Sequence, residues 1–209
     1  MTALEVADWR RRTFALYAAI RENPDAASAH AVWRAGRDEM FATHPASPLL
    51  PEDLRGFKGL PFESYNPDWR FEASIVPALG LPEAVRRMEV ETGTDGLVPF
   101  DFLGTVEIDQ VGTLDVWRLA SYGGGIFIPV KDALSGVPGG TYGGGRYLID
   151  TVKGADLGPG STPESLVLDF NFAYNPSCAY DPAWACPLAQ AGNTLAVQVP
   201  VGERYSASS

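Results

Sequence analysis

The hydrophobic period of this chain changes once, near residue 68, and this change limits the folds that the chain can adopt. Before that point, apolar residues recur at helical spacing. Residues 3–22 predict one amphipathic helix and residues 25–42 predict a second. Asn23 is the expected N-cap of the second helix, with Pro24 as its first residue. The two helices are therefore expected to form a hairpin that packs on the rest of the chain.

After residue 68, apolar and polar residues alternate with the two-residue period of β-strands. The 22 Gly and 17 Pro favour turns between many short strands. Because no long helix intervenes, we expect antiparallel pairing. The predicted fold is mainly β, a curled antiparallel sheet or barrel with the N-terminal α-helical hairpin, α+β overall. We expect one domain, 1–209, with a helical part (1–60) packed on a β body (65–205). The expected strands are 69–75, 84–91, 97–109, 113–121, 125–131, 145–152, 165–172 and 194–201.

The charge of the chain excludes some classes of partner. A formal net charge of −10 is opposite to what nucleic-acid binding needs, and it disfavours anionic membrane surfaces. No apolar run is long enough to cross a bilayer, and the N-terminus lacks the basic and apolar regions of a secretory signal. We therefore expect a cytoplasmic protein that binds neither nucleic acid nor membrane. A small-molecule ligand and a homo-oligomer are both compatible with the composition.

Asp169 and Asn171 share one face of the predicted strand 165–172, while aliphatic and aromatic residues take the other face. A buried carboxylate needs a partner, and Arg146 on the preceding predicted strand is the expected one. In the functional interpretation, these residues form the polar floor of a ligand pocket, with Asp169 as acid/base or ligand anchor. In the structural interpretation, Asp169 pairs with Arg146 and Asn171 holds the loop that follows.

Seven residues separate Cys178 from Cys186. Metal and redox motifs favour two intervening residues, and His30 and His44 are the two histidines that could add nitrogen ligands. The sequence therefore predicts no metal site and requires no cofactor. Two interpretations stay open, a pair of free thiols and a local disulfide, and a cytoplasmic location favours the thiols.

A few other polar residues are candidates for a site. His30, on the second predicted helix, is expected to be a surface or packing residue and not a catalyst. His44 follows the second predicted helix, where it either ends the helix or closes a pocket as a catalytic candidate. Lys131 ends a predicted strand and could bind an anionic group of a substrate. Tyr174 and Asn175, which follow the strand 165–172, complete the candidate ligand-binding residues.

Several segments together match the pattern of one family. They are Trp33, Arg37-Asp38, His44-Pro45, Phe57–Leu60, Thr141–Leu148, Asp169–Pro176, Cys178 and Cys186–Leu188. With these residues, the chain over roughly 9–205 resembles the bacterial and archaeal family called domain of unknown function 1684. The resemblance implies a one-domain protein of this size and no established activity, cofactor or catalytic residue. The chain departs from the family's pattern at 128–136 and inserts Val137–Gly140.

The residues leave two hypotheses for function. The first is a small-molecule-binding β-barrel protein, with or without catalysis, whose polar pocket lies around Arg146 and Asp169. The alternative is a non-catalytic structural or protein-interaction domain, in which the same residues brace the core. A pocket of roughly a few hundred Å³ shared by Arg146, Asp169 and His44 would favour the first hypothesis. Full pairing of these groups in a dry core would favour the second.

Overall fold

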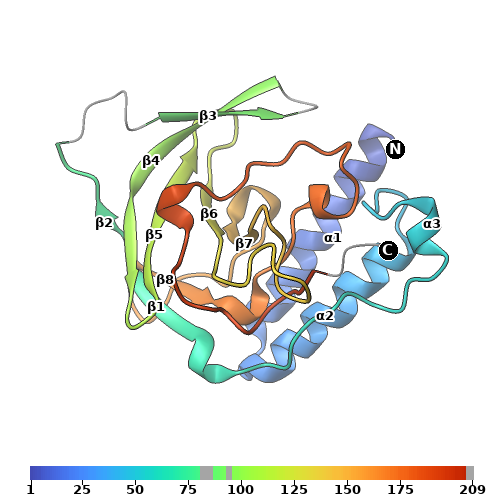
Figure 1. Ribbon diagram of the computed structural model, residues 1–209, viewed down its shortest axis with the longest axis horizontal. Helices are drawn as coiled ribbons and strands as arrows, with labels where there is room; N and C mark the ends of the chain where they lie inside the picture. The colour runs from blue at the N-terminus through green and yellow to red at the C-terminus, as the bar shows by residue number, and fades with distance from the viewer. Residues whose placement is uncertain (81–86, 93–95, 206–209) are drawn as a thin grey trace.

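The N-terminal part of the protein forms the expected helical hairpin. In a computed structural model, which describes residues 1–80, 87–92 and 96–205, α1 spans Ala3–Glu22 and α2 spans Ala26–Thr43. Thr2 and Glu5 form a capping box at the start of α1. The N-cap of α2 is Asp25, whose carboxylate accepts from Ser28 N at 2.8 Å, so the prediction of Asn23 as N-cap was wrong. The two helices lie side by side (Figure 1).

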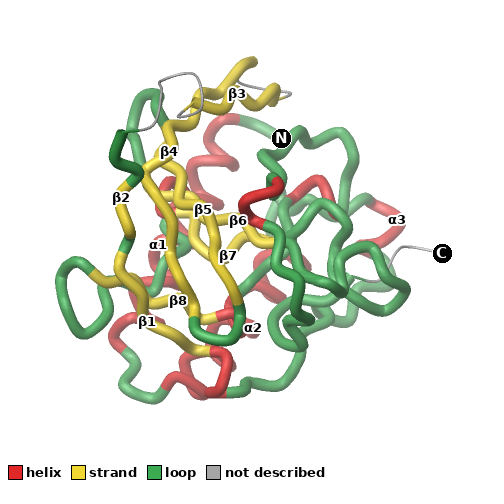
Figure 2. The backbone as a smooth tube through the Cα atoms, turned by 60° about the vertical axis from the view of Figure 1, so that its left-hand side comes forward, coloured by secondary structure: helices red, strands yellow, loops and turns green. Residues whose placement is uncertain are grey.

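The strands form two antiparallel sheets. The larger sheet has the order β2-β4-β5-β6-β7, with β3 also paired to β4, and the smaller one pairs β1 with β8. Figure 2 shows the strands gathered on one side of the molecule and long loops on the other. Within the described residues the sheets do not close into a barrel, so the curled sheet is the alternative that holds. The strands are β1 (Arg70–Ser74), β2 (Val76–Pro77), β3 (Arg87–Thr92), β4 (Gly96–Ile108), β5 (Gly112–Leu119), β6 (Ile126–Val130), β7 (Arg146–Asp150) and β8 (Ser165–Asp169).

Irregular pairing curls the larger sheet. The register of β4 against β5 shifts between Phe102 and Gly104, and that of β6 against β7 shifts between Ile128 and Pro129. Such bulges bend a strand and increase its twist. Gly104 has a φ of +152°, and a Cβ there would lie 2.0 Å from the Val76 carbonyl oxygen. Glycine at this position therefore lets β2 approach β4 closely.

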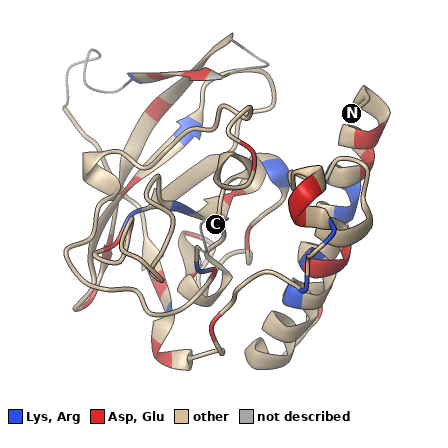
Figure 3. Ribbon diagram, turned by 45° about the vertical axis from the view of Figure 1, so that its right-hand side comes forward, with Lys and Arg blue, Asp and Glu red and all other residues tan. Residues whose placement is uncertain are grey.

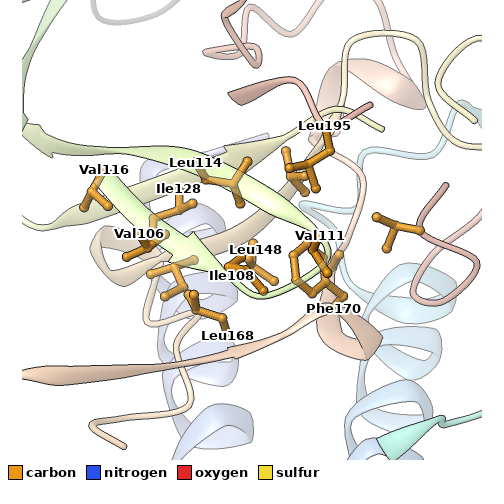
Figure 4. Close-up of a cluster of buried hydrophobic side chains, with 14 of the residues drawn as sticks. Val106, Ile108, Val111, Leu114, Val116, Ile128, Leu148, Leu168, Phe170 and Leu195 are labelled. Atoms are coloured by element: carbon orange, nitrogen blue, oxygen red, sulfur yellow. The ribbon is translucent and has the colours of Figure 1, made fainter. Parts of the chain in front are cut away.

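Two apolar clusters fill the interior. The first lies between the β4–β5 hairpin and β8, where Val106, Leu114 and Leu168 are fully buried (Figure 4). The second joins the helical hairpin to the other face of the sheet and is mostly aromatic, with Trp33, Phe127 and Tyr147 among its members. Because the sheet is covered on both faces, its strands β6 and β7 are buried along most of their length.

Most of the predicted elements are confirmed. The helices and the strands near 69–75, 97–109, 113–121, 125–131 and 145–152 are present. In addition, the structure has a short helix α3 (Pro51–Leu54) and 3-10 turns at Pro67–Trp69, Thr151–Lys153, Phe170–Phe172, Ser177–Ala179 and Ala191–Asn193.

Three predicted strands need comment. The predicted strand 165–172 ends at Asp169, because a 3-10 turn takes over the alternating residues 170–172. The segment 194–201 was predicted as a strand, but it forms one bridge, between Thr194 and Lys131, and the prediction was wrong. Of the predicted strand 84–91, residues 84–86 lie outside the described residues. The remainder belongs to β3, which pairs at the sheet edge with β4.

No helix in the described part of the chain is long and apolar enough to span a bilayer.

Candidate functional site

A cavity of about 470 Å³ lies between the helical hairpin and the aromatic face of the larger sheet. Its walls come from α1, α2, strands β4 to β7, the turn after β7, and two stretches of the chain after β8. In Figure 1, these late stretches (orange to red) lie between the helices and the strands. The volume is within the range of sites that hold a small organic molecule.

The wall of this cavity is rich in aromatic side chains. On α1, Trp9, Thr13 and Tyr17 lie at the four-residue spacing of one helical face, which explains why all three line the cavity. The aromatic lining residues are Trp9, Tyr17, Phe41, Phe100, Tyr122, Phe127, Tyr147, Tyr174 and Trp184. Such a lining favours a planar or otherwise apolar ligand.

The charged residues of the wall are mostly basic. Arg10, Arg37 and Lys153 line the cavity against one carboxylate, that of Asp150. This balance is opposite to that of the whole chain, which has a net charge of −10. Figure 3 shows both basic and acidic residues along α1. A site with this excess of cations favours an anionic group on its ligand.

Arg37, in the C-terminal half of α2, is held by one ion pair and by contacts with several aromatic rings. Its Nη2 donates to Glu203 Oε2 at 3.0 Å, and Glu203 is fully buried. The guanidinium carbon lies 4.8 Å from the centroid of Tyr174 and 5.1 Å from that of Phe41. Burial raises the pKa of Glu203, although Arg37 opposes this by stabilising the carboxylate. These contacts restrain the guanidinium to one position.

Two polar atoms beside this pair have no hydrogen-bond partner among the described residues. They are Arg37 Nε and Asn175 Oδ1, and both are buried. Both residues line the cavity. A buried polar atom without a partner is costly, because it loses its water and gains no bond. Neither atom is accessible to solvent, so both lie beneath the surface of the cavity wall and not on it.

Lys153 supplies a second cation of the wall. It belongs to the 3-10 turn Thr151–Lys153, whose N-cap Asp150 accepts from Lys153 N at 3.4 Å. The ammonium Nζ lies 3.5 Å from Asp150 Oδ2 and 5.5 Å from the centroid of Tyr147. The lysine side chain is 45% exposed, so it can turn toward a ligand at a small cost.

The buried tyrosines of the wall stay neutral hydroxyl groups. Burial raises the pKa of Tyr17, Tyr147 and Tyr174 well above the ordinary value. The Tyr147 hydroxyl donates to the Pro187 carbonyl at 2.7 Å, which ties the late loop to β7. These side chains therefore act as apolar walls and hydrogen-bonding groups, not as bases at neutral pH.

Arg146 does not reach this cavity and does not pair with Asp169. It is fully buried, and its Nη2 donates to Asp132 Oδ2 at 2.7 Å. The guanidinium also donates to the carbonyls of Val199, Val201 and Glu203. The predicted Arg146–Asp169 pair was wrong because β7 pairs with β6, and Asp132 lies two residues beyond Val130, the register partner of Arg146. Arg146 therefore fastens the C-terminal loop to the sheet.

Asp169 pairs with Arg70, which is its register partner on β1, at 3.2 Å. Its other oxygen accepts from Asn171 N and Asn171 Nδ2, at 3.0 and 2.7 Å. Burial raises the pKa of Asp169, and these donors oppose the shift. Asn171 also bonds the backbone of Asn66 through both ends of its amide, and its carbonyl accepts from His30 Nε2. The Asp169–Asn171 unit thus holds three distant segments together, and neither residue lines the cavity.

The other predicted site residues divide between the cavity and elsewhere. Tyr174 and Asn175 line the cavity. His44 is buried beside it, where its Nδ1 accepts from Ala46 N and its Nε2 therefore donates to Asp8 Oδ2, at 3.1 Å. Lys131 is outside the lining, and its backbone bonds Asn193 and Leu195. The structure thus brings two of the seven candidates to one cavity.

The cysteines are free thiols, and Cys186 lines the cavity. Within the described residues, no group of three or more His, Cys, Asp or Glu side chains is placed to hold a metal ion. The cavity wall therefore offers thiol, hydroxyl, amide and cationic groups, but no metal-binding cluster in the described part of the chain.

Sequence reasoning missed Arg10, Arg37, Asp150 and Lys153 as residues of one site. For Arg37 a signal existed, because it follows Trp33 by four residues and precedes Met40 by three, on the helical face predicted to be buried. A cation on such a face is unusual and indicates a partner. For Lys153 there was no local signal, because its role depends on how the helices pack on the sheet.

The fold and the cavity define a small α+β protein with a curled antiparallel sheet, a helical hairpin and a ligand-sized cavity between them. The chain belongs to the family described as "Protein of unknown function (DUF1684)", whose model matches residues 55–204. This confirms the family predicted from the sequence. Both long helices precede the matched residues, so the part of the cavity wall formed by α1 and α2 lies outside the match.

The chain is also similar to a solved structure. This is the solution NMR structure of an uncharacterised protein of Haloarcula marismortui, with 32% sequence identity and a TM-score of 0.59. The similarity covers 82% of this chain and 89% of that one. A comparison with curated proteins gives no match. Neither comparison assigns an activity to the cavity.

Proposed function

We propose that this protein binds a small, largely apolar molecule with an anionic group in the cavity between the helical hairpin and the sheet. The observation that carries the proposal is that Arg10, Arg37 and Lys153 line an aromatic wall with one carboxylate, Asp150, in a strongly acidic chain. If the lining had the same charge balance as the whole chain, it would be acidic, whereas it is mainly basic.

Different residues of the wall would bind different parts of the ligand. Aromatic rings stabilise the apolar part of the ligand by excluding water. Lys153 and Arg10, which line the cavity, attract the anionic group.

The proposal is one of binding, not of a reaction. The lining includes no histidine, and its single carboxylate, Asp150, bonds Lys153 through both of its oxygens. A general base needs a free acceptor within reach of the reacting proton. We propose further that the protein acts in the cytoplasm, where its two cysteines would remain thiols.

The residues that the sequence predicted to lie in a pocket have a different role in this proposal. Arg146, Asp169 and Asn171 make hydrogen bonds to Asp132, Arg70 and Asn66 away from the cavity. This pairing favours a bracing role, in which they hold the C-terminal loop and the small sheet in place. Bracing and binding are compatible, because Glu203 of the braced C-terminal loop pairs with Arg37 of the cavity wall.

Native mass spectrometry of the protein purified from its own host tests the proposal directly. We expect a bound acidic small molecule that is released on denaturation. A Thr13→Trp variant from the same host should lack it, because the indole would fill the cavity from α1. An Ala15→Trp variant, on the exposed face of the same helix, should retain it. A ligand that both variants retain would contradict the proposed position.

A further inference from the structure

The two cysteines of the chain come together at the cavity, although seven residues separate them. The 3-10 turn Ser177–Ala179 and a following turn closed by the bond from Trp184 N to Asp181 O reverse the chain. As a result, Cys178 and Cys186 lie close enough for their thiols to interact. Both are free and both are partly exposed.

The surroundings of the two sulfurs differ. Cys186 lies in the cavity wall, which Lys153 and Tyr147 also line. Cys178 lies beside the Tyr142 hydroxyl, whose oxygen is 3.8 Å from its Sγ. Further titratable groups on this side are Asp150 and Tyr174 in the wall and Tyr205, whose ring centroid lies 5.1 Å from that of Tyr142. A cation near one sulfur of a pair makes that sulfur the better thiolate.

We propose that Cys178 and Cys186 form a reactive dithiol in the cavity wall, which low-molecular-weight disulfides oxidise to an intramolecular disulfide with Cys186 as the attacking thiol. The assignment rests on the position of Cys186 in the cavity wall, which Lys153 also lines and Cys178 does not, and on the turns that bring the two cysteines together. The short loop between the cysteines is already folded back, so closing it needs little further ordering.

The chemistry is two successive thiol–disulfide exchanges. The Cys186 thiolate attacks one sulfur of the small disulfide, forms a mixed disulfide and releases the other half as a thiolate, which takes a proton from water. Cys178 then loses its proton and attacks Cys186 Sγ. This step forms the Cys178–Cys186 bond and releases the second small thiol. The protein loses two hydrogens and two electrons, and the small disulfide gains them.

The electrostatics agree with this order of events. The hydrogen bond from Cys178 lowers the pKa of Cys186, and the charge of Lys153 adds to the effect. The same hydrogen bond raises the pKa of Cys178, and burial raises it further. Cys186 therefore reacts as a thiolate below the ordinary thiol pKa of about 8.5, whereas Cys178 retains its proton.

Oxidised glutathione serves as the probe, with the reduced full-length protein and no cavity ligand. After incubation and quenching with iodoacetamide, peptide mapping should find the Cys178–Cys186 disulfide. Cys178→Ser should accumulate glutathione on Cys186, and Cys186→Ser should keep Cys178 as a thiol under the same conditions. A wild-type protein that stays reduced, or that holds glutathione without forming the internal disulfide, would overturn the proposal.

A second measurement needs no variant, in case the serine proteins fail to fold. In the reduced wild type at neutral pH, iodoacetamide should alkylate Cys186 at least about tenfold faster than Cys178. Equal rates, or a faster Cys178, would contradict the assignment of the attacking thiol. Both measurements follow the sulfurs alone, so their result is independent of whether the cavity binds the anionic molecule proposed above.

Discussion

The Asp132 carboxylate and the Arg146 guanidinium lie 2.7 Å apart, and neither side chain is exposed to solvent. The arginine also donates to three carbonyls of the chain between Val199 and Glu203. One buried ion pair thus joins the end of β6, strand β7 and the C-terminal loop. Because Glu203 of this loop pairs with Arg37 of the cavity wall, the position of the Asp132–Arg146 pair also affects the shape of the proposed site.

Asp132→Asn should destabilise the protein by about 3–5 kcal/mol, since it leaves the charge of Arg146 buried without its counter-ion. Urea denaturation measures the free energy of unfolding. Glu63→Gln is the matched control, because Glu63 pairs with Arg204 at 2.8 Å while 44% exposed. We expect that control to cost about 1 kcal/mol or less. Equal losses for the two variants would show that the buried pair is not a main brace.

His30 should make stability depend on pH in the acid range. Burial lowers the pKa of His30 from 6.5 to about 4, although its bond to the Asn171 carbonyl opposes the shift. Between these values the unfolded chain binds a proton that the folded protein does not. The free energy of unfolding should therefore fall as the pH falls from 6.5 to about 4. Above pH 6.5 this contribution is fully present.

His30→Gln tests the assignment, because glutamine does not titrate and its amide can still donate to the Asn171 carbonyl. Urea denaturation of both proteins at several pH values gives the two slopes. The difference in stability between wild type and variant should shrink toward acid pH. If it stays constant from neutral to acid pH, His30 is not the source of the dependence.

Lys153→Gln should weaken the binding of an anionic aromatic probe. With 8-anilino-1-naphthalenesulfonate, we expect a loss of about two- to fivefold in affinity, equivalent to about 0.5–1 kcal/mol for one partly exposed cation. Lys58→Gln changes the net charge equally at an exposed position outside the cavity, and it should leave binding unchanged. Similar losses in both variants would point to the overall charge instead of the cavity.

The sequence predicts the helices and most strands because their patterns are local. The spacing of Trp9, Tyr17 and Ile20 already defines the buried face of α1. The segment 194–201 alternates in the same way as a strand, but after Thr194 it finds no neighbouring strand among the described residues. Its backbone bonds to Lys131 and Ala133 instead. Alternation indicates which residues are buried, and it does not supply a pairing partner.

The candidate site was harder to predict, because it depends on contacts between distant segments. Asp169 and Arg146 were correctly expected to be buried and paired, but each has another partner, Arg70 and Asp132. Strand parity alone could not show that β8 pairs with β1 and β7 with β6. Likewise, Lys153 and Arg37 meet at the cavity only because the helical hairpin covers the aromatic face of the sheet.

The central claim is that the cavity between α1 and the sheet is a binding site. A fluorescence titration with 8-anilino-1-naphthalenesulfonate, on the folded wild type, Thr13→Trp and Ala15→Trp, tests it most directly. Thermal denaturation first checks that all three proteins are folded. We expect one saturable site in the wild type and in Ala15→Trp, and a loss of affinity of at least about tenfold in Thr13→Trp. Unchanged affinity in Thr13→Trp would show that the probe binds elsewhere and would contradict the account.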